Sequence, residues 1–221
     1  MSYNKTSAII AMCLGDGHID KHDRLTMKHC EKQKEYFDYK LKILQTLQKQ
    51  PVWNNVYEQF NPKYNKSYKS FQLATRQKPT YRIVKKWMSN GITRKLLNKL
   101  DNHAIAIWFM DDGSTTLLKS NYVREDGTIS QKPRATVTYL STYTTLEQNQ
   151  VIVDYFKEVH DIRWTPHYNK LSNSYLLRMG TKEGKKFGKL IESYVLPCVR
   201  YKIDKLIIQD NAPHKEDENI V

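Results

Sequence analysis

Several protein classes are excluded by what this 221-residue sequence lacks. It has only three cysteines, Cys13, Cys30 and Cys198, which are far apart and form no C-x-x-C pair. A disulfide-rich secreted fold is therefore excluded, and structural zinc is disfavoured. No apolar run approaches the roughly 18 residues that a membrane span needs, and the first residues show no secretory pattern. We expect an intracellular protein of a phage, an organelle or a bacterium, with no targeting signal and no membrane partner.

Acidic residues are scarce relative to basic ones. The chain has 23 Asp and Glu against 36 Lys and Arg, which gives a formal net charge of +13. An excess of this size indicates a polyanionic partner, and nucleic acid before membrane. Hydrophobic residues make up 39% of the chain, which is enough to build a core and excludes pervasive disorder.

One pattern of elements is written twice along the chain. Each copy reads as a buried apolar helix, a hairpin, an amphipathic helix, two strands and a last helix. The order predicts an α+β fold of two pseudo-symmetric αββαββα halves, residues 1–95 and 96–209, followed by a flexible tail over 210–221. The expected elements of the first half are a helix capped by Thr6 or Ser7, a hairpin over 18–29, a helix over 31–50, strands over 52–60 and 68–76, and a helix over 80–89. Those of the second are a helix from 102, a hairpin that turns at 125–128, a helix over 145–159, strands over 162–168 and 174–179, and a helix over 182–194.

Two aspartates follow the two apolar helices at matching positions. Asp16 and Asp112 are 96 positions apart, and each precedes a glycine. If the helices pack side by side and parallel, both carboxylates meet at the negative ends of the helix dipoles, where they repel each other. Such an arrangement needs a compensating charge, and a divalent cation such as Mg²⁺ suits oxygen ligands. The alternative is that each Asp-Gly pair merely ends a helix and starts a turn.

The two helix ends carry a resemblance to a known family. AIIAMCLGDG and AIAIWFMDDG resemble the two copies of the LAGLIDADG motif, and the chain is similar over about residues 5–205 to single-chain LAGLIDADG homing endonucleases of the subgroup with LGD and WFMDDG motifs. The resemblance implies a saddle of antiparallel sheets over DNA, with the two motif helices packed at the central interface. It implies a site-specific double-strand DNA endonuclease active in intron homing, a monomer with a long asymmetric target. Mg²⁺, replaceable by Mn²⁺, would then be bound by Asp16 and Asp112, while Asp111 helps to end its helix.

The resemblance also implies a basic catalytic residue in each half. Lys202, which follows Pro197 and Tyr201 near the end of the chain, matches this position in the second half. In the first half the expected lysine does not align, because Ser89 or Asn90 stands near its place. Lys86 is the nearest candidate upstream, and Lys95 is the nearest downstream.

Basic and amide side chains on the expected strands are candidates for DNA contact. A twisted antiparallel sheet can lie in the major groove with alternate side chains facing the bases, and many phosphate contacts predict a steep salt dependence. The candidates are Lys21, Arg24, Lys28, Lys66, Lys69, Gln72, Arg76, Lys119, Arg124, Lys132, Arg134, Arg163, His167, Lys170 and Arg178.

A second class of function uses the same scaffold without cleavage. An intron RNA maturase or a DNA-binding regulator would need the basic strands but not both acidic residues, and a maturase would add intron RNA as a partner. Because Asp16 and Asp112 are both present, the sequence favours the endonuclease.

Overall fold

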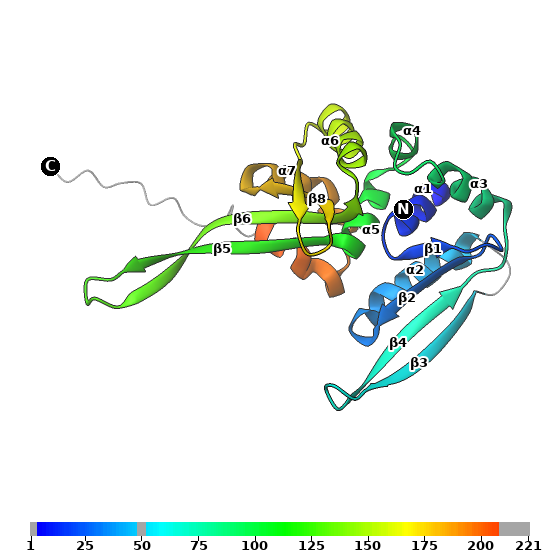
Figure 1. Cartoon of the computed structure of the whole chain (residues 1–221), viewed down its shortest axis with the longest axis horizontal. Coiled ribbons are helices and arrows are strands. Elements are labelled where there is room, and N and C mark those ends of the chain that lie inside the picture. The colour runs from blue at the N-terminus through cyan, green and yellow to red at the C-terminus, as the bar shows by residue number, and fades with distance from the viewer. Residues whose placement is uncertain (1–3, 48–51, 208–221) are drawn as a thin grey trace.

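The computed structural model describes residues 4–47 and 52–207, and it places two similar halves side by side (Figure 1). The first half consists of α1 (Lys5–Leu14), β1 (Gly17–Ile19), β2 (Leu25–Cys30), the 3₁₀ turn η1 (Glu31–Gln33), α2 (Lys34–Leu47), β3 (Trp53–Asn61), β4 (Lys66–Ala74) and α3 (Pro79–Met88). The tail predicted over 210–221 lies outside the described residues.

The second half repeats this order. After the short helix α4 (Arg94–Leu97) come α5 (Asn102–Asp112), β5 (Gly113–Val123), β6 (Ile129–Thr144), α6 (Leu146–His160), β7 (Thr165–Asn169), β8 (Ser174–Gly180), α7 (Thr181–Ile191), the 3₁₀ turns η2 (Glu192–Tyr194) and η3 (Pro197–Lys202), and α8 (Asp204–Ile207). The predicted α+β fold with a repeated αββαββα order is confirmed. Only the short elements α4, η3 and α8 were not expected.

Each half contains one antiparallel sheet of four strands. The strand orders are β1-β2-β4-β3 and β5-β6-β8-β7, so the two sheets have the same topology. Helix α2 packs on one face of the first sheet, where the rings of Phe37 and Phe71 lie 5.7 Å apart, and α6 packs on the corresponding face of the second. We call the opposite face of each sheet, which these helices do not cover, its open face.

The centre of the molecule is formed by α1 and α5. Residues 7–12 of α1 and 103–110 of α5 are buried on every side. A helix that is apolar all round must be surrounded by other elements, and each large aliphatic side chain buried here contributes roughly 1.5–3 kcal/mol. The two most hydrophobic helices therefore hold the halves together. None of the helices in the described part of the chain is long and apolar enough to cross a bilayer.

The N-terminal ends of α1 and α5 are joined through Asp101. Its Oδ1 accepts from the backbone N–H of Ala104 at 2.8 Å and caps α5, while its Oδ2 accepts from the N–H of Asn4 at 3.2 Å. The Asp101 N–H donates to Ser7 Oγ at 2.9 Å. The cap of α1 is Asn4, whose Oδ1 accepts from the N–H groups of Thr6 and Ser7, so the cap expected at Thr6 or Ser7 was wrong. Ser7 is instead used across the helix interface.

A long hairpin, β5–β6, extends away from the second half (Figure 1). Leu118 pairs with Ala135 and Lys119 with Pro133, so Arg134 is the extra residue of a β-bulge. A bulge bends a hairpin and increases its twist. In the first half the protruding hairpin is β3–β4, which is equivalent to β7–β8 and not to β5–β6. The hairpins that protrude from the two halves are therefore not equivalent to each other.

Replacing Asp101 with Ala should lower the free energy of unfolding by about 1–3 kcal/mol, because the change removes the cap of α5 and the carboxylate contact with the Asn4 N–H, while the backbone contact with Ser7 remains. Thr145→Ala is the matched control, since Thr145 caps only its own helix α6 through the N–H of Gln148. Urea unfolding curves measure both variants. An Asp101→Ala variant no less stable than Thr145→Ala would contradict the role of Asp101 across the interface.

Candidate functional site

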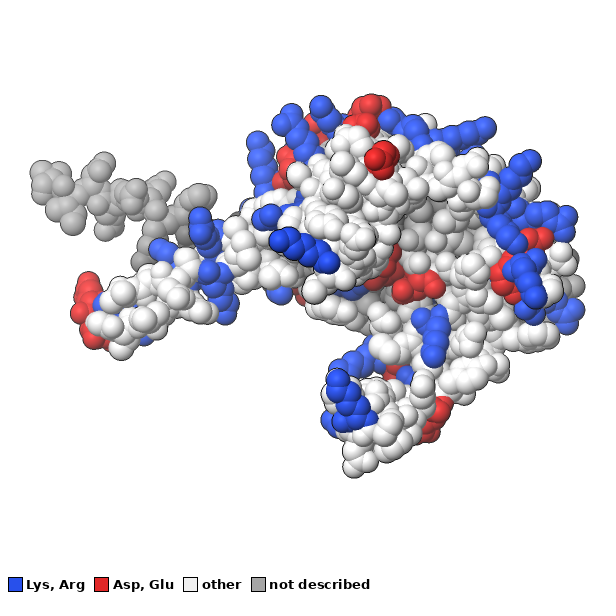
Figure 2. Space-filling model, in the orientation of Figure 1, with Lys and Arg blue, Asp and Glu red and all other residues white. Residues whose placement is uncertain are grey.

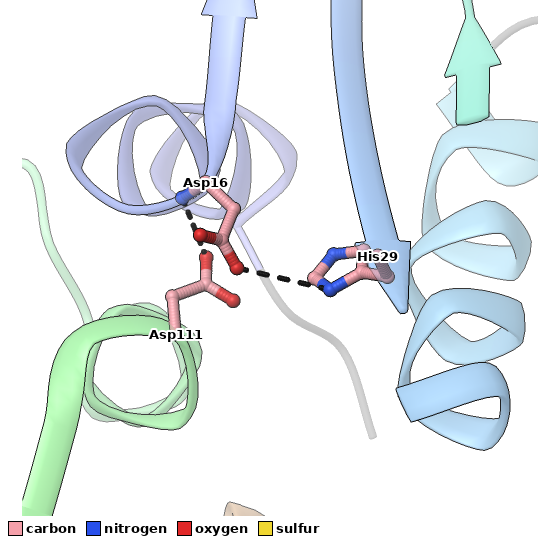
Figure 3. Close-up of side chains that lie close together, drawn as sticks. All are labelled: Asp16, His29 and Asp111. Atoms are coloured by element: carbon pink, nitrogen blue, oxygen red, sulfur yellow. Dashed lines mark hydrogen bonds and ion pairs between the residues drawn. The ribbon is translucent and has the colours of Figure 1, made fainter. Parts of the chain in front are cut away.

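The C-terminal ends of α1 and α5 meet at Gly15 and Asp111. A side chain at Gly15 would overlap the Asp111 carboxylate, so only glycine leaves room for this approach. The Asp111 Oδ2 accepts from the backbone N–H of Asp16 at 3.3 Å (Figure 3). The two helices are therefore joined at both ends, which makes them parallel. The prediction that Asp16 and Asp112 lie close together assumed this parallel packing.

Asp111 is a central member of the site rather than a residue that ends a helix. Its side chain is fully buried, and its Oδ1 accepts from the Nζ of Lys40, also fully buried, at 2.5 Å. Lys40 comes from the middle of α2 in the first half. A buried charge is tolerated when it is paired in this way, and the pair ties the first half to the second.

His29 lies between Lys40 and Asp16. Its Nδ1 is 3.7 Å from Asp16 Oδ2 and 3.2 Å from Gln33 Oε1, and its Nε2 is 3.2 Å from Lys40 Nζ. Burial, reinforced by the charge of Lys40, lowers the pKa of His29 to about 4, so the ring is neutral at physiological pH. Asp16, His29 and Asp111 each offer an atom within 4.8 Å of the others, although they come from three different elements (Figure 3).

Asp112 has a carboxyl group with a raised pKa and no direct ion-pair partner among the described residues. Burial, and then the charges of Asp111 and Asp16, raise its pKa to about 7. The pKa of Asp16 is also raised, first by burial and then by Asp111. In the part of the chain that the structure describes, no basic side chain lies within ion-pair distance of Asp112. Carboxylate oxygens whose charge is only partly offset have the donor chemistry that a divalent cation prefers.

Lys202 reaches this cluster and Lys86 does not. Lys202 lies on η3, and its Nζ donates to the carbonyl oxygens of Met110 and Asp111 at 2.6 and 2.8 Å, at the C-terminal end of α5. Burial lowers the pKa of Lys202. Lys86 lies on α3, where it lines a separate hollow with Trp87 and Lys95, so neither first-half candidate is at the carboxylates. The cations that act on the pKa of Asp16 and Asp112 are Lys40 and Lys202.

Lys40 and His29 were not predicted as site residues, although each is a polar residue at a position where the sequence pattern expects a buried apolar one. Lys40 is four residues after Tyr36 and four before Leu44, which places a cation on the apolar face of its helix. His29 continues the alternation of the buried residues Leu25 and Met27 along β2. A polar residue on a buried face is the informative exception in such patterns.

The strand registers divide the predicted nucleic-acid contacts by face. Phe71 and Leu73 of β4 face α2, so alternation puts Lys66 and Gln72 on the open face. Lys69 pairs with Glu58 of β3 and faces the α2 side of the sheet. It is therefore on the opposite face from Lys66 and Gln72. Outside the long hairpin, the predicted residues on the open faces are Lys28, Lys66 and Gln72 in the first half, and His167 and Arg178 in the second.

The other predicted contacts lie on the long hairpin and in turns. Lys119, Lys132 and Arg134 are on β5 and β6, and Arg124 is at the tip. Lys21, Arg24, Arg76, Arg163 and Lys170 are in turns and loops, where Arg24 forms an ion pair with Asp20 at 2.7 Å. His167 and Lys170 line a hollow on the open face of the second sheet. Figure 2 shows basic side chains over both halves and the hairpin, and acidic ones at several places on the surface, including the space between the halves.

Comparison with protein-family models identifies one family. The model described as the LAGLIDADG DNA endonuclease family matches residues 6–187. A curated protein, Protein RecA of Mycolicibacterium flavescens, is 24% identical over 215 residues, which cover 92% of this chain and 47% of that protein. The chain thus spans about half the length of that relative.

Solved structures show the same fold. The homing endonuclease I-WcaI bound to its DNA recognition sequence matches with a TM-score of 0.70 and 20% identity, over 92% of this chain and 88% of that one. Meganuclease I-SmaMI bound to uncleaveable DNA with a TTCT central four matches with a TM-score of 0.57 and 10% identity, over 94% and 91%.

Asp112→Asn should stabilise the metal-free protein in a pH-dependent way. A carboxyl whose pKa rises on folding from 3.8 to about 7 opposes folding once it is ionised, so stability falls as the pH rises through this window. The variant should gain nothing near pH 4 and about 1–3 kcal/mol above pH 7, after allowance for solvent screening. Urea unfolding with EDTA measures this gain. Asp38→Asn, at an exposed carboxyl of α2, is the control, and an identical trend there would contradict the assignment.

Proposed function

The chain belongs to the LAGLIDADG DNA endonuclease family, and from this premise we propose that it is a site-specific homing endonuclease that hydrolyses both strands of a double-stranded DNA target with a divalent cation. The observation that carries this proposal is the meeting of acidic groups from both halves at the joined ends of α1 and α5. A protein that only binds DNA has no need of clustered carboxylates with raised pKa values. Metal-dependent phosphodiester hydrolysis does need clustered carboxylates, because in their ionised form they bind the cation beside the phosphate that is attacked.

The acidic groups fit a hard divalent cation. Asp16 and Asp112 would hold Mg²⁺, for which Mn²⁺ would substitute, because both offer carboxylate oxygens that no protein cation neutralises fully. When bound, the cation supplies an activated water and stabilises the attacking and leaving oxygens of the phosphodiester. Asp111 is taken up by Lys40 and by the Asp16 backbone, so it is not available in the same way.

Lys202 would assist from the second half. Its ammonium group neutralises the carbonyl end of α5, where the helix dipole would otherwise repel both the carboxylates and an incoming phosphate. Its charge also lowers the pKa of Asp112 and Asp16, which favours the ionised forms that bind a cation. In this role Lys202 is the basic residue of the second-half active site.

The open faces and the long hairpin would grip the DNA. Each half, residues 1–95 and 96–209, would place its sheet in the major groove on one side of the cleavage site. Because β3–β4 protrudes in one half and β5–β6 in the other, the two sides of the target would be contacted differently. This supports a long asymmetric target bound by a monomer.

A randomised duplex library tests the function directly. The protein is incubated with the library and Mg²⁺, and the cut ends are sequenced; we expect one long asymmetric site cut in both strands. Recovery of a bound but uncut sequence would instead support the DNA-binding regulator, and selective binding of intron RNA without cleavage would support the maturase.

Asp16→Asn and Asp112→Asn should each reduce cleavage of the selected site by about a hundredfold or more, because each removes a charged oxygen from the cation site. Binding to the same DNA in Ca²⁺ should stay close to wild type, since neither residue lies on an open face. Single-turnover cleavage and gel-shift titration measure the two effects. Asp38→Asn serves as the surface control, and normal cutting of both strands by either active-site variant would remove its aspartate from the site.

Lys66→Ala should weaken DNA binding more than Lys69→Ala, although the two lysines are three residues apart on β4 and both are exposed. Only Lys66 faces the open side, as the pairing register requires. Loss of one phosphate contact should reduce the slope of log K against log salt by about 0.9. Titrations at several salt concentrations measure this slope, and equal effects of the two variants would contradict the assignment of the faces.

A further inference from the structure

A closed ring of polar contacts lies behind Asp16. The Asp16 N–H donates to Asp111, Lys40 donates to the other oxygen of Asp111 and to His29 Nε2, and His29 Nδ1 faces the Asp16 carboxylate at 3.7 Å. Its members come from β2, α2, α5 and the end of α1, so the ring crosses from the first half to the second and back. Figure 3 shows three of the four members, Asp16, His29 and Asp111.

The ring is buried except at Asp16. The side chains of Lys40, Asp111 and His29 are 0% exposed, whereas that of Asp16 is 38% exposed. Buried ion pairs of this kind are often no more stabilising than well-packed apolar residues of similar size. Stability alone therefore gives little reason to place charges here, and the one member that reaches the surface is the proposed metal ligand.

Hydrogen-bond chemistry fixes the direction of the contacts. The ammonium group of Lys40 can only donate, so the Nε2 of His29 accepts from it, and the ring proton of neutral His29 stays on Nδ1. Nδ1 then donates toward Gln33 and Asp16 and has no lone pair for a metal ion. His29 thus acts on Asp16 as a donor, although its position beside two carboxylates suggests a metal ligand.

We propose that Lys40 and His29 are positioning residues for Asp16: Lys40 fixes the Asp111 carboxylate that holds the Asp16 backbone, and it fixes the tautomer with which His29 faces the Asp16 side chain. Lys40 is thereby the functional lysine of the first half, acting from α2 and not from the segment before α5. The inference rests on the proposed function for the role of Asp16 as a metal ligand.

The first test is the affinity for Mn²⁺, measured from the EPR signal of the free ion in titrations of the protein. Lys40→Met should raise the apparent dissociation constant about 10–100-fold, as loss of a group that orients a ligand does elsewhere. Lys42→Met is the matched control, because Lys42 is an exposed lysine of the same helix. Equal Mn²⁺ affinities for Lys40→Met and wild type would overturn the proposal.

A double variant separates positioning from mere stability. Lys40→Met leaves Asp111 buried without its partner, and Lys40→Met with Asp111→Asn removes both charges, which should restore the midpoint of urea unfolding. The Mn²⁺ affinity should remain weak, because His29 Nε2 still lacks its donor. Recovery of the affinity together with the stability would show that Lys40 and Asp111 form a structural pair only, against the proposal.

His29 provides an independent comparison. His29→Gln keeps an N–H donor beside Asp16 and His29→Phe does not, while both leave the contact of Lys40 with Asp111 in place. Glutamine should retain Mn²⁺ affinity better than phenylalanine, and the same order should appear in the Mg²⁺ concentration needed for half-maximal cleavage. Equal losses in the two variants would count against His29.

Failure of the proposed function would look different. A wild-type protein that cuts no library duplex, but whose Mn²⁺ affinity depends on Lys40, would refute the endonuclease and support the positioning role. A wild type that cuts DNA, with a Lys40→Met variant of unchanged metal dependence, would refute the positioning role alone.

Discussion

The close approach of α1 and α5 at Gly15 and Asp111 is the constraint on which the rest of the molecule depends. Because glycine leaves a space there, a carboxylate of one half enters it and bonds to the backbone of the other. The same approach gathers Asp16, Asp111 and Asp112 at the negative ends of two helix dipoles. Buried Lys40 and Lys202 offset part of this charge. A divalent cation would offset the remainder and so allow a DNA phosphate to approach.

The fold and the approach of the two apolar helices could be predicted from the sequence because they depend on local patterns. Apolar runs that end in Asp-Gly occur twice at matching positions, and alternation along the strands marks the sheets. The helix and strand ends agree with the structure to within a few residues where the structure describes them. The predicted end of the helix over 31–50 lies outside the described residues. The start of α1 differed, because Asn4 competes with Thr6 and Ser7 for the cap, and Ser7 bonds to Asp101 across the helix interface.

The surroundings of the aspartates could not be predicted in the same way. Lys86 is near α5 in sequence but lines a different hollow, whereas Lys40 is 71 residues from Asp111 and touches it. Such a contact depends on how α2 lies against the partner half, which no local pattern encodes. Likewise, Lys69 and Lys66 look equivalent in the sequence, and only the pairing of β4 with β3 separates their faces. The bulge at Arg134 depends on pairing as well.

Gly15 and Asp111 hold equivalent positions in the two repeats, but their side chains are complementary. The absence of a side chain at Gly15 leaves the space that the Asp111 carboxylate occupies. Two copies of the first half would leave a void between two glycines, and two copies of the second would press two carboxylates into one space. Neither half can therefore form a well-packed homodimer through this surface. The same complementarity governs chimeras: a half grafted from a relative will dock only if it brings the matching member of the pair.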